Sequence, residues 1–196
     1  SLSGDSARRS SGYVDQVIRP LVSHSTSSVS SLVWQVESKT ESCELTFDIV
    51  YRVRGDLSNL VIPNPCTMPS REDNLWQDTC FEVFLRQTNQ TQQYLEFNFS
   101  PAGHWAFYRF RDYRVDLERP PAHEPPTITV QIRGDDLFLV AKIPWFMIHD
   151  TLPGNLPLEI GLSVILKDRN GEISYWAIMH PSDKPDFHHP DSFVAL

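Results

Sequence analysis

A tryptophan and a glutamate stand close together in LWQDTCFEVFL, residues 75–85, a stretch that otherwise has the pattern of a strand. Glu82 is flanked by Phe81 and Val83, and Trp76 stands six residues before it. A carboxylate accepts hydrogen bonds from hydroxyl groups, and an indole ring stacks on the C–H face of a sugar. The two residues could therefore form the floor and the wall of a binding site. The plainer alternative is that Glu82 faces solvent from an ordinary strand.

Two neighbouring stretches, CFEVFLR (80–86) and YLEFNFS (94–100), show the same mixture of apolar and polar positions. Side chains alternate between the two faces of a strand, and alternate positions in both stretches are wholly apolar. These apolar positions are assigned to the core. The opposite face then carries Glu82, Phe84, Tyr94, Glu96 and Asn98.

The turn SPAG at 100–103 predicts a tight hairpin into HWAFYRF (104–110). If Ser100 pairs with Gly103, the face that holds Glu96 gains three more residues: Trp105, Phe107 and Arg109. A shift of this register by one residue would move all three to the other face, so the register is a hypothesis.

Aromatic rings, carboxylates, an amide and a guanidinium on one sheet face suit a small polyhydroxylated ligand. Trp176, in EISYWAIMH (172–180), is the candidate for a second stacking wall opposite Trp76. The alternative is a face half covered by long loops, with Glu96 paired to Arg109 and both tryptophans packed in the interior.

Histidines gather in the segment HPSDKPDFHHP, at His180, His188 and His189. With a carboxylate such as Glu82 they could bind zinc or iron, since neutral imidazole is a common metal ligand. The alternative is that they cap strand ends and hold loops. A haem is also open, with Met68 and His180 or His188 as distant axial ligands.

Glu82 and Glu96 could also act as the acid and base of glycoside hydrolysis, which needs two carboxyl groups with divergent pKa values. Carboxylates that share a strand face are common, however. The question of an enzyme is left open, with a leaning against it.

The elements that must position these residues are short strands separated by turns. They are predicted at 32–38, 43–53, 80–86, 94–100, 104–110, 127–133, 136–144, 158–168 and 172–180. One helical turn is predicted at 144–152, with Pro144 at its start. Frequent turns and almost no helix predict an all-β fold, an antiparallel β-sandwich of jelly-roll or immunoglobulin-like topology.

The 196 residues suggest one domain, predicted at 32–196, preceded by a flexible serine-rich tail at 1–31. The net charge of −8 and the lack of a basic patch argue against a nucleic-acid partner. No apolar run reaches the ~20 residues of a membrane span. Cys43, Cys66 and Cys80 have no CxxC spacing, and no secretory signal is visible, so reduced thiols and a cytoplasmic location are expected.

LWQDTCFEVFL, YLEFNFSPAGHWAFYRFRDYR and YWAIMHPSDKPDFHHPDSF together resemble the DOMON-like domains related to family 9 carbohydrate-binding modules. The resemblance covers residues 32–196, and its most specific parts, EFNFSPxGxW and YWAxxHPxxxPDFHH, are similar to a bacterial DOMON-like group. It implies a β-sandwich that clamps a terminal sugar between two tryptophans or holds haem b through a Met and a His. Trp76 and Glu82 match the sugar-binding pattern, while its calcium-binding acidic cluster has no clear counterpart.

We therefore expect a non-catalytic module that recognises a sugar or glycoside on the concave sheet face. The alternatives are a haem-binding, cytochrome-like module and, behind it, a small enzyme on this fold. A protein partner is left open, because binding modules are usually attached to what they target. The predicted ligand contacts are Glu82, Glu96, Asn98 and Arg109 for hydrogen bonds, Trp76, Trp105 and Trp176 for stacking, and His180 and His188 at the rim.

Overall fold

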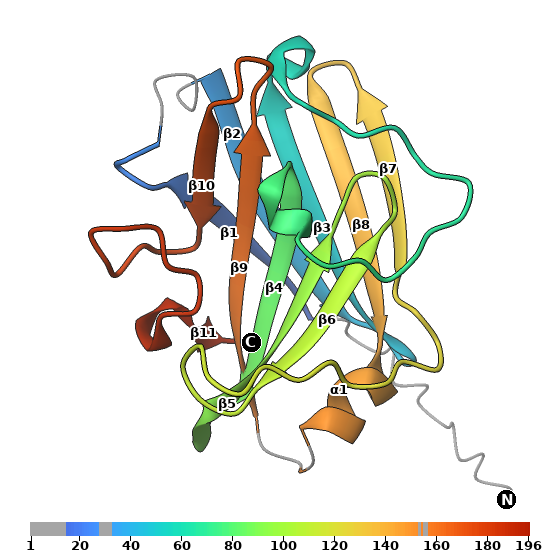
Figure 1. Cartoon of the computed structure of the whole chain (residues 1–196), viewed down its shortest axis with the longest axis vertical. Helices are drawn as coiled ribbons and strands as arrows, with labels where there is room; N and C mark the ends of the chain where they lie inside the picture. Colours follow the sequence, from blue (N-terminus) through green and yellow to red (C-terminus); the bar gives the residue numbers. More distant parts are fainter. Residues whose placement is uncertain (1–14, 28–32, 153, 155–156) are drawn as a thin grey trace, which may run out of the picture.

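The computed structural model describes residues 15–27, 33–152, 154 and 157–196, which form a strongly curled antiparallel sheet with one short α-helix (Figure 1). The predictions of an all-β antiparallel fold and of a helical turn after Pro144 are confirmed. No helix in these ranges is long and apolar enough to cross a membrane. The strands are β1 (Gln16–Ser23), β2 (Trp34–Ser42), β3 (Thr46–Gly55), β4 (Cys80–Gln87), β5 (Gln90–Phe99), β6 (Trp105–Phe110), β7 (Thr127–Arg133), β8 (Asp136–Pro144), β9 (Leu158–Lys167), β10 (Ile173–Ala177) and β11 (Val194–Ala195). The helices are α1 (Trp145–Thr151) and the 3-10 turns η2 (Leu57–Asn59), η3 (Leu75–Gln77) and η4 (Pro190–Ser192).

The sheet has two halves that lie face to face as a sandwich. One half has the order β6-β5-β4-β9-β10, with β11 beside β9, and the other has the order β1-β2-β3-β8-β7. They join where Val22 and Ser23 of β1 pair with Ala177 and Trp176 of β10. In Figure 1 the green and orange strands of the first half lie in front of the blue and yellow strands of the second.

The space between the halves is filled by the apolar positions predicted to be core, such as Phe81, Val83 and Phe97. Tyr51 of β3 reaches across this space. Its ring lies 5.2 Å from that of Phe81, and its hydroxyl donates a 2.7 Å hydrogen bond to the carbonyl of Glu82. The apolar face of β4 is therefore the inner one, and the face that carries the Glu82 side chain is the outer one.

The predicted tail contains a strand. Residues 16–23 form β1, which pairs with β2 from Gln16↔Glu41 to Leu21↔Val36, so the prediction of a flexible tail is wrong for this segment. The strand was missed because serines dominate the composition around a short apolar stretch. Leu21 of this stretch is buried in the core. Residues 1–14 and 28–31 of the predicted tail lie outside the described residues.

The turn between β5 and β6 is one residue longer than predicted. Ser100 N donates to the carbonyl of His104 at 2.9 Å, and Gly103 N donates to the carbonyl of Ser100 at 2.9 Å. Ser100 is therefore opposite His104, not Gly103. Gly103 has a φ of +100°, which glycine adopts without the steric cost that a side chain would add.

The longer turn reverses the two faces of β6 relative to the prediction. Trp105, Phe107 and Arg109 lie opposite core-facing residues of β5, and Tyr108 lies opposite Glu96. The expectation that the three odd-numbered residues share the face of Glu96 is wrong. Tyr108 and its alternate neighbours occupy that face instead.

Candidate functional site

A cleft of about 700 Å³ opens on the outer face of the half-sheet that contains β4, β5 and β6. Strand residues that point away from the core form its floor. Three loops form its walls: the segment around η3, the segment that follows β6, and the segment between β10 and η4. The strand residues that line the cleft are Glu82, Glu96, Asn98, Tyr108, Phe110, Ile165 and Tyr175.

The polar floor consists of Glu82, Glu96 and Asn98, which are only 3%, 6% and 1% exposed. Glu82 Oε2 accepts a 3.0 Å hydrogen bond from Ser163 Oγ, and Glu96 Oε1 accepts one of 3.0 Å from Asn98 Nδ2. Asn98 Oδ1 is buried and has no hydrogen-bond partner among the described residues. The predicted grouping of these three residues on one face is correct, and the structure places them together at one cleft.

Both floor carboxyl groups hold their protons more tightly than an exposed carboxyl group does. Loss of water raises the pKa of Glu96 to about 7, against the opposing effects of the Asn98 hydrogen bond and the Arg114 charge. The pKa of Glu82 is raised well above its usual range, first by burial and then by repulsion from Glu96, which outweigh the Ser163 hydrogen bond. The pair therefore retains a proton near neutral pH, as expected for two adjacent carboxyl groups out of water.

His188 stands beside this pair as a neutral side chain. Burial, and then the charge of Arg114, lower the pKa of His188 to about 4. The Tyr94 hydroxyl accepts a 3.2 Å hydrogen bond from Arg114 N and shares a 2.8 Å hydrogen bond with His188 Nδ1. The other ring nitrogen, Nε2, lies 3.7 Å from Glu96 Oε2. Because the imidazole is neutral, this contact is not an ion pair.

Two arginines of the wall segment that follows β6 line the cleft, and each has a carboxylate partner. Arg114 donates to Asp186 at 2.9 Å, and Arg119 lies 3.2 Å from Asp73. Asp73 also accepts a 2.6 Å hydrogen bond from the Tyr108 hydroxyl. These pairs connect the wall loops to one another and to the sheet. Among the described residues, no cationic side chain forms a hydrogen bond with the acidic floor.

Trp76 lies at the rim of the cleft, as the sequence predicted for a wall. It sits on η3, which begins after Asn74, a residue with a positive φ of 60°. The side chain is 52% exposed although most tryptophans in folded proteins are largely buried. An exposed indole that borders a polar cleft is available for stacking on a ligand ring.

Trp176 does not form the second wall. It faces Val164 and the core, is 5% exposed, and donates its indole N–H to Ser174 Oγ at 2.9 Å. Its neighbour Tyr175 points to the opposite face and lines the cleft with Phe187. Alternation along β10 explains the difference, since adjacent strand residues face opposite sides. Alternation alone does not show which side is the inner one, because Ile173, Tyr175 and Ala177 form the more apolar set and Trp176 shares its face with Ser174.

Two further predicted contacts lie outside the cleft as a result of the β6 register. Trp105 is packed against the core, with the Arg71 guanidinium 5.4 Å from its ring centre. Arg109 pairs with Glu118, with Nε at 2.9 Å from Oε2. The alternative in which Arg109 neutralises Glu96 is therefore wrong.

The three histidines do not converge on one point. His180 Nε2 contacts the carbonyl of Val22 at 2.7 Å, and His189 Nδ1 accepts from Asp191 N at 3.1 Å and caps η4. Only His188 of the three lines the cleft. Across the described part of the chain, no group of three or more His, Cys, Asp or Glu side chains is placed to hold a metal ion. These contacts match the alternative in which His180 and His189 cap strand ends and hold loops.

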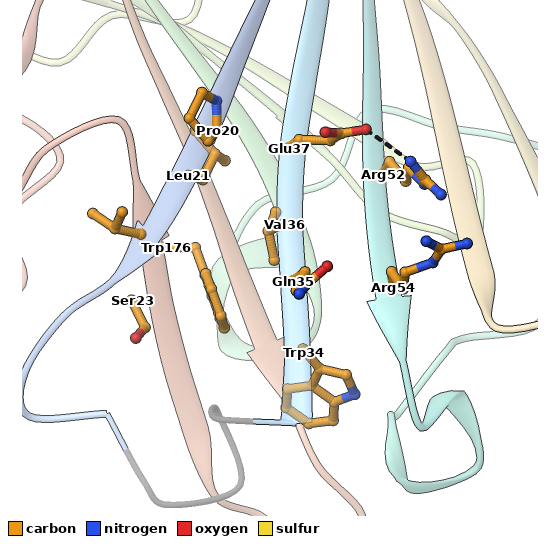
Figure 2. A pocket seen from close by; sticks show the side chains of 11 residues that line it. Pro20, Leu21, Ser23, Trp34, Gln35, Val36, Glu37, Arg52, Arg54 and Trp176 are labelled. Atoms are coloured by element: carbon orange, nitrogen blue, oxygen red, sulfur yellow. Dashed lines mark hydrogen bonds and ion pairs between the residues drawn. The ribbon is translucent and has the colours of Figure 1, made fainter.

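A second cavity, of about 480 Å³, lies where β1 and β2 separate (Figure 2). Trp34 and Trp176 border it, but they are 3% and 5% exposed, and each indole N–H donates to a neighbouring group of the protein. Glu37 and Arg52 on its outer side form an ion pair at 3.0 Å. Because its aromatic rings are packed and its charges are paired, this cavity is a weaker ligand site than the cleft.

The chain matches no protein-family model and no curated protein. Solved structures do match it. A Bacteroides uniformis protein for which carbohydrate binding is proposed has a TM-score of 0.64 at 14% identity, over 91% of this chain and 84% of that one. A family 9 carbohydrate-binding module from Caldicellulosiruptor kristjanssonii has TM-scores of 0.51 in its complex with cellotriose and 0.52 in its complex with glucose, both at 11% identity. These alignments cover 92% and 93% of this chain and 80% and 82% of the module.

The fold of this chain is accordingly that of the family 9 carbohydrate-binding modules, a strongly curled antiparallel sheet. At 11% to 14% identity the likeness concerns the fold. The finer resemblance to DOMON-like domains stays a prediction from the sequence motifs.

Proposed function

We propose that the cleft beside Trp76 binds a sugar or glycoside without catalysing a reaction on it. The observation that carries this proposal is the half-exposed Trp76 indole at the rim of a cleft whose floor is the buried Glu82–Glu96–Asn98 group. A sugar ring offers C–H faces to an indole and hydroxyl donors to carboxylate and amide oxygens, so one ligand satisfies both features.

The structural neighbours support the same class of ligand. The family 9 module of Caldicellulosiruptor kristjanssonii is described in complex with cellotriose and with glucose. On this fold a ligand of that size suits a cleft of about 700 Å³. Tyr175 and Tyr108 add further aromatic surface to the cleft lining.

The test is isothermal titration calorimetry with glucose, cellotriose and a panel of common mono- and disaccharides. We expect Trp76→Ala to weaken binding by about tenfold or more, since stacking on an aromatic ring contributes roughly 1–3 kcal/mol to affinity. Trp145→Phe is the matched control, because Trp145 lies on α1 and does not line the cleft. Equal affinities of wild type and Trp76→Ala for a sugar that binds would contradict the stacking model, and failure of every sugar would contradict the function.

Glycoside hydrolysis is a second candidate, favoured by the raised pKa values of the buried pair Glu82 and Glu96. Release of reducing sugar or of a chromogenic aglycone from a bound glycoside would establish it. In that case Glu82→Gln should abolish turnover and leave binding nearly unchanged. A wild-type protein that binds glycosides and releases no product supports the non-catalytic proposal.

Haem binding has less support from the cleft residues. His188 Nδ1 already bonds to Tyr94, His180 Nε2 contacts Val22, and the cleft lining contains no methionine. The visible absorption spectrum, recorded with and without added haemin, tests this alternative directly. A stoichiometric Soret band that disappears in His188→Ala would favour haem over sugar.

A further inference from the structure

The floor of the cleft has more hydrogen-bond acceptors than donors. Glu82 and Glu96 present four carboxyl oxygens, and Asn98 Oδ1 is a buried acceptor with no partner in the described part of the chain. The donors that reach these oxygens are Ser163 Oγ and Asn98 Nδ2. A buried acceptor without a donor is costly, so a ligand that supplies several donors at this point would gain affinity.

The floor also lacks a positive charge in contact with it. Arg114 and Arg119 have partners in Asp186 and Asp73 at the rim. His188 is neutral, because burial holds its pKa near 4. Besides His188, the titratable groups that interact with the pair from the surrounding elements are Tyr51, Cys80, Tyr94, Tyr108 and Arg114. Of these groups only Arg114 is cationic near neutral pH, and its guanidinium is bound to Asp186.

We propose that the Glu82–Glu96–Asn98 floor binds a protonated amine, so that the preferred ligand is an amino sugar and not its neutral parent. The inference rests on the proposed sugar-binding function of the same cleft. An ammonium group has three donors and one positive charge, which match the unfilled acceptors and the repulsion between the two carboxyl groups. The aromatic rings of Tyr108 and Phe110, which line the same cleft, also attract cations.

A neutral hydroxyl is a poorer match for this floor. A hydroxyl group donates a single hydrogen bond. It carries no charge to offset the repulsion between Glu82 and Glu96, so the two carboxyl groups must share a proton when a neutral ligand is bound. A divalent metal ion is a poorer match as well, because the described residues bring no group of three or more His, Cys, Asp or Glu side chains together to hold one.

The preference for the amine should depend on pH. Burial raises the pKa of Glu96 to about 7, and that of Glu82 lies well above its usual range. Binding of a cation favours the ionised pair, so it should release protons near neutral pH and lose its advantage as the pH falls and both carboxyl groups become protonated.

The experiment is calorimetric titration of the whole chain with glucose, galactose and mannose and with their 2-amino-2-deoxy and 6-amino-6-deoxy derivatives. At about pH 7.5 we expect at least one amino sugar to bind about tenfold more tightly than its parent, with proton release visible in buffers of different ionisation enthalpy. At about pH 5.5 we expect the ratio to fall below about threefold. This comparison uses wild-type protein throughout and needs no variant to fold.

Variants then locate the effect. Glu96→Gln should reduce the ratio of amino-sugar to neutral-sugar affinity towards one. Glu37→Gln removes the same charge from β2, outside the cleft, and should leave the ratio unchanged. Equal loss in both variants would assign the preference to the net charge of the protein and overturn the inference.

The remaining outcomes separate this inference from the function on which it rests. Neutral sugars that bind as tightly as every amino derivative overturn the amine-binding floor and leave sugar binding intact. A chain that binds no sugar of either kind overturns both.

Discussion

Burial of Glu82 and Glu96 is energetically unfavourable, because each carboxylate loses its hydration and lies close to another acid. The structure provides Ser163 and Asn98 as partial hydrogen-bond partners and a neutral His188 beside Glu96. These partners orient the acids but do not neutralise them. Such a pair weakens the fold in the absence of a ligand, and this is the usual cost of a prepared binding site.

The raised pKa of Glu96 predicts how stability changes with pH. The folded protein holds this proton up to about pH 7, while the unfolded chain releases it near 4.5. The contribution of Glu96 to stability is therefore full below pH 4.5 and is lost as the pH rises through 7. Glu96→Gln should stabilise the protein at about pH 8, by on the order of 1–3 kcal/mol, and should have little effect at about pH 4.

Urea denaturation of wild type and Glu96→Gln across this pH range measures the difference. The comparison between the two proteins is needed because the lowered pKa of His188 acts in the other direction, with stability rising as the pH increases from about 4 to 6.5. That contribution is present in both proteins and largely cancels. A Glu96→Gln protein less stable than wild type at about pH 8 would contradict a buried, proton-holding pair.

In the cleft half-sheet, β4, β5, β6, β9 and β10 each have residues that line the cleft on one face and residues packed in the core on the other. β10 shows this most clearly, since Tyr175 lines the cleft and the adjacent Trp176 is packed in the core. On β5, Glu96 and Asn98 alternate with Leu95, Phe97 and Phe99 in the same way. The site is therefore held by the same backbone hydrogen bonds that hold the core, which keeps its geometry rigid.

Substitutions at two adjacent positions of β10 should affect different properties, sugar binding at Tyr175 and stability at Trp176. Tyr175→Ala should weaken sugar binding by about tenfold and change the free energy of unfolding by less than about 1 kcal/mol, because Tyr175 is part of the cleft lining. Trp176→Ala should lower the free energy of unfolding by about 3–5 kcal/mol, because it leaves a cavity in the core. Calorimetric titration and chemical denaturation of both variants give the comparison. Equal effects of the two substitutions on binding would mean that the strand does not divide its roles in this way.

The sandwich as a whole places the cleft on the outer face of one half and depends on contacts across the core. Tyr51 makes such a contact, from β3 in one half to the carbonyl of Glu82 in the other. β1 makes another, since it pairs with β2 along most of its length and with β10 at Val22 and Ser23. The carboxyl pair is thus supported from behind by the opposite half of the molecule.

Tyr51→Phe should lower the free energy of unfolding by about 1–2 kcal/mol, the usual loss for a buried hydrogen bond. Tyr113→Phe is the control, since the Tyr113 ring is partly exposed and its hydroxyl bonds to Asp186 at the surface. We expect the control to change stability by less than about 0.5 kcal/mol. Equal losses in the two variants, measured by urea denaturation, would show that the contact across the core is not special.

Two predictions about the whole protein stay predictions. Cys43, Cys66 and Cys80 are free thiols in the structure. A cytoplasmic location and a protein partner need cell fractionation and affinity capture, respectively, to test them.

Alternation along single strands was enough to predict much of this protein. The apolar sets of β4 and β5 identified the core face, and the same pattern placed Glu82, Glu96 and Asn98 together on the other face, because side chains on one strand must alternate. Trp76 was also predicted correctly as a neighbour of this group. These are local properties, and the order of residues in the chain decides them.

Relations between strands and loops required the tertiary structure. One extra residue in the turn before His104 moved Trp105 and Arg109 out of the site and brought Tyr108 into it. That choice depends on backbone hydrogen bonds in the turn, which the residue types SPAG do not specify uniquely. The pKa of Glu96 and the neutrality of His188 arise from burial under loops that are distant in sequence, and only the packed chain creates that environment.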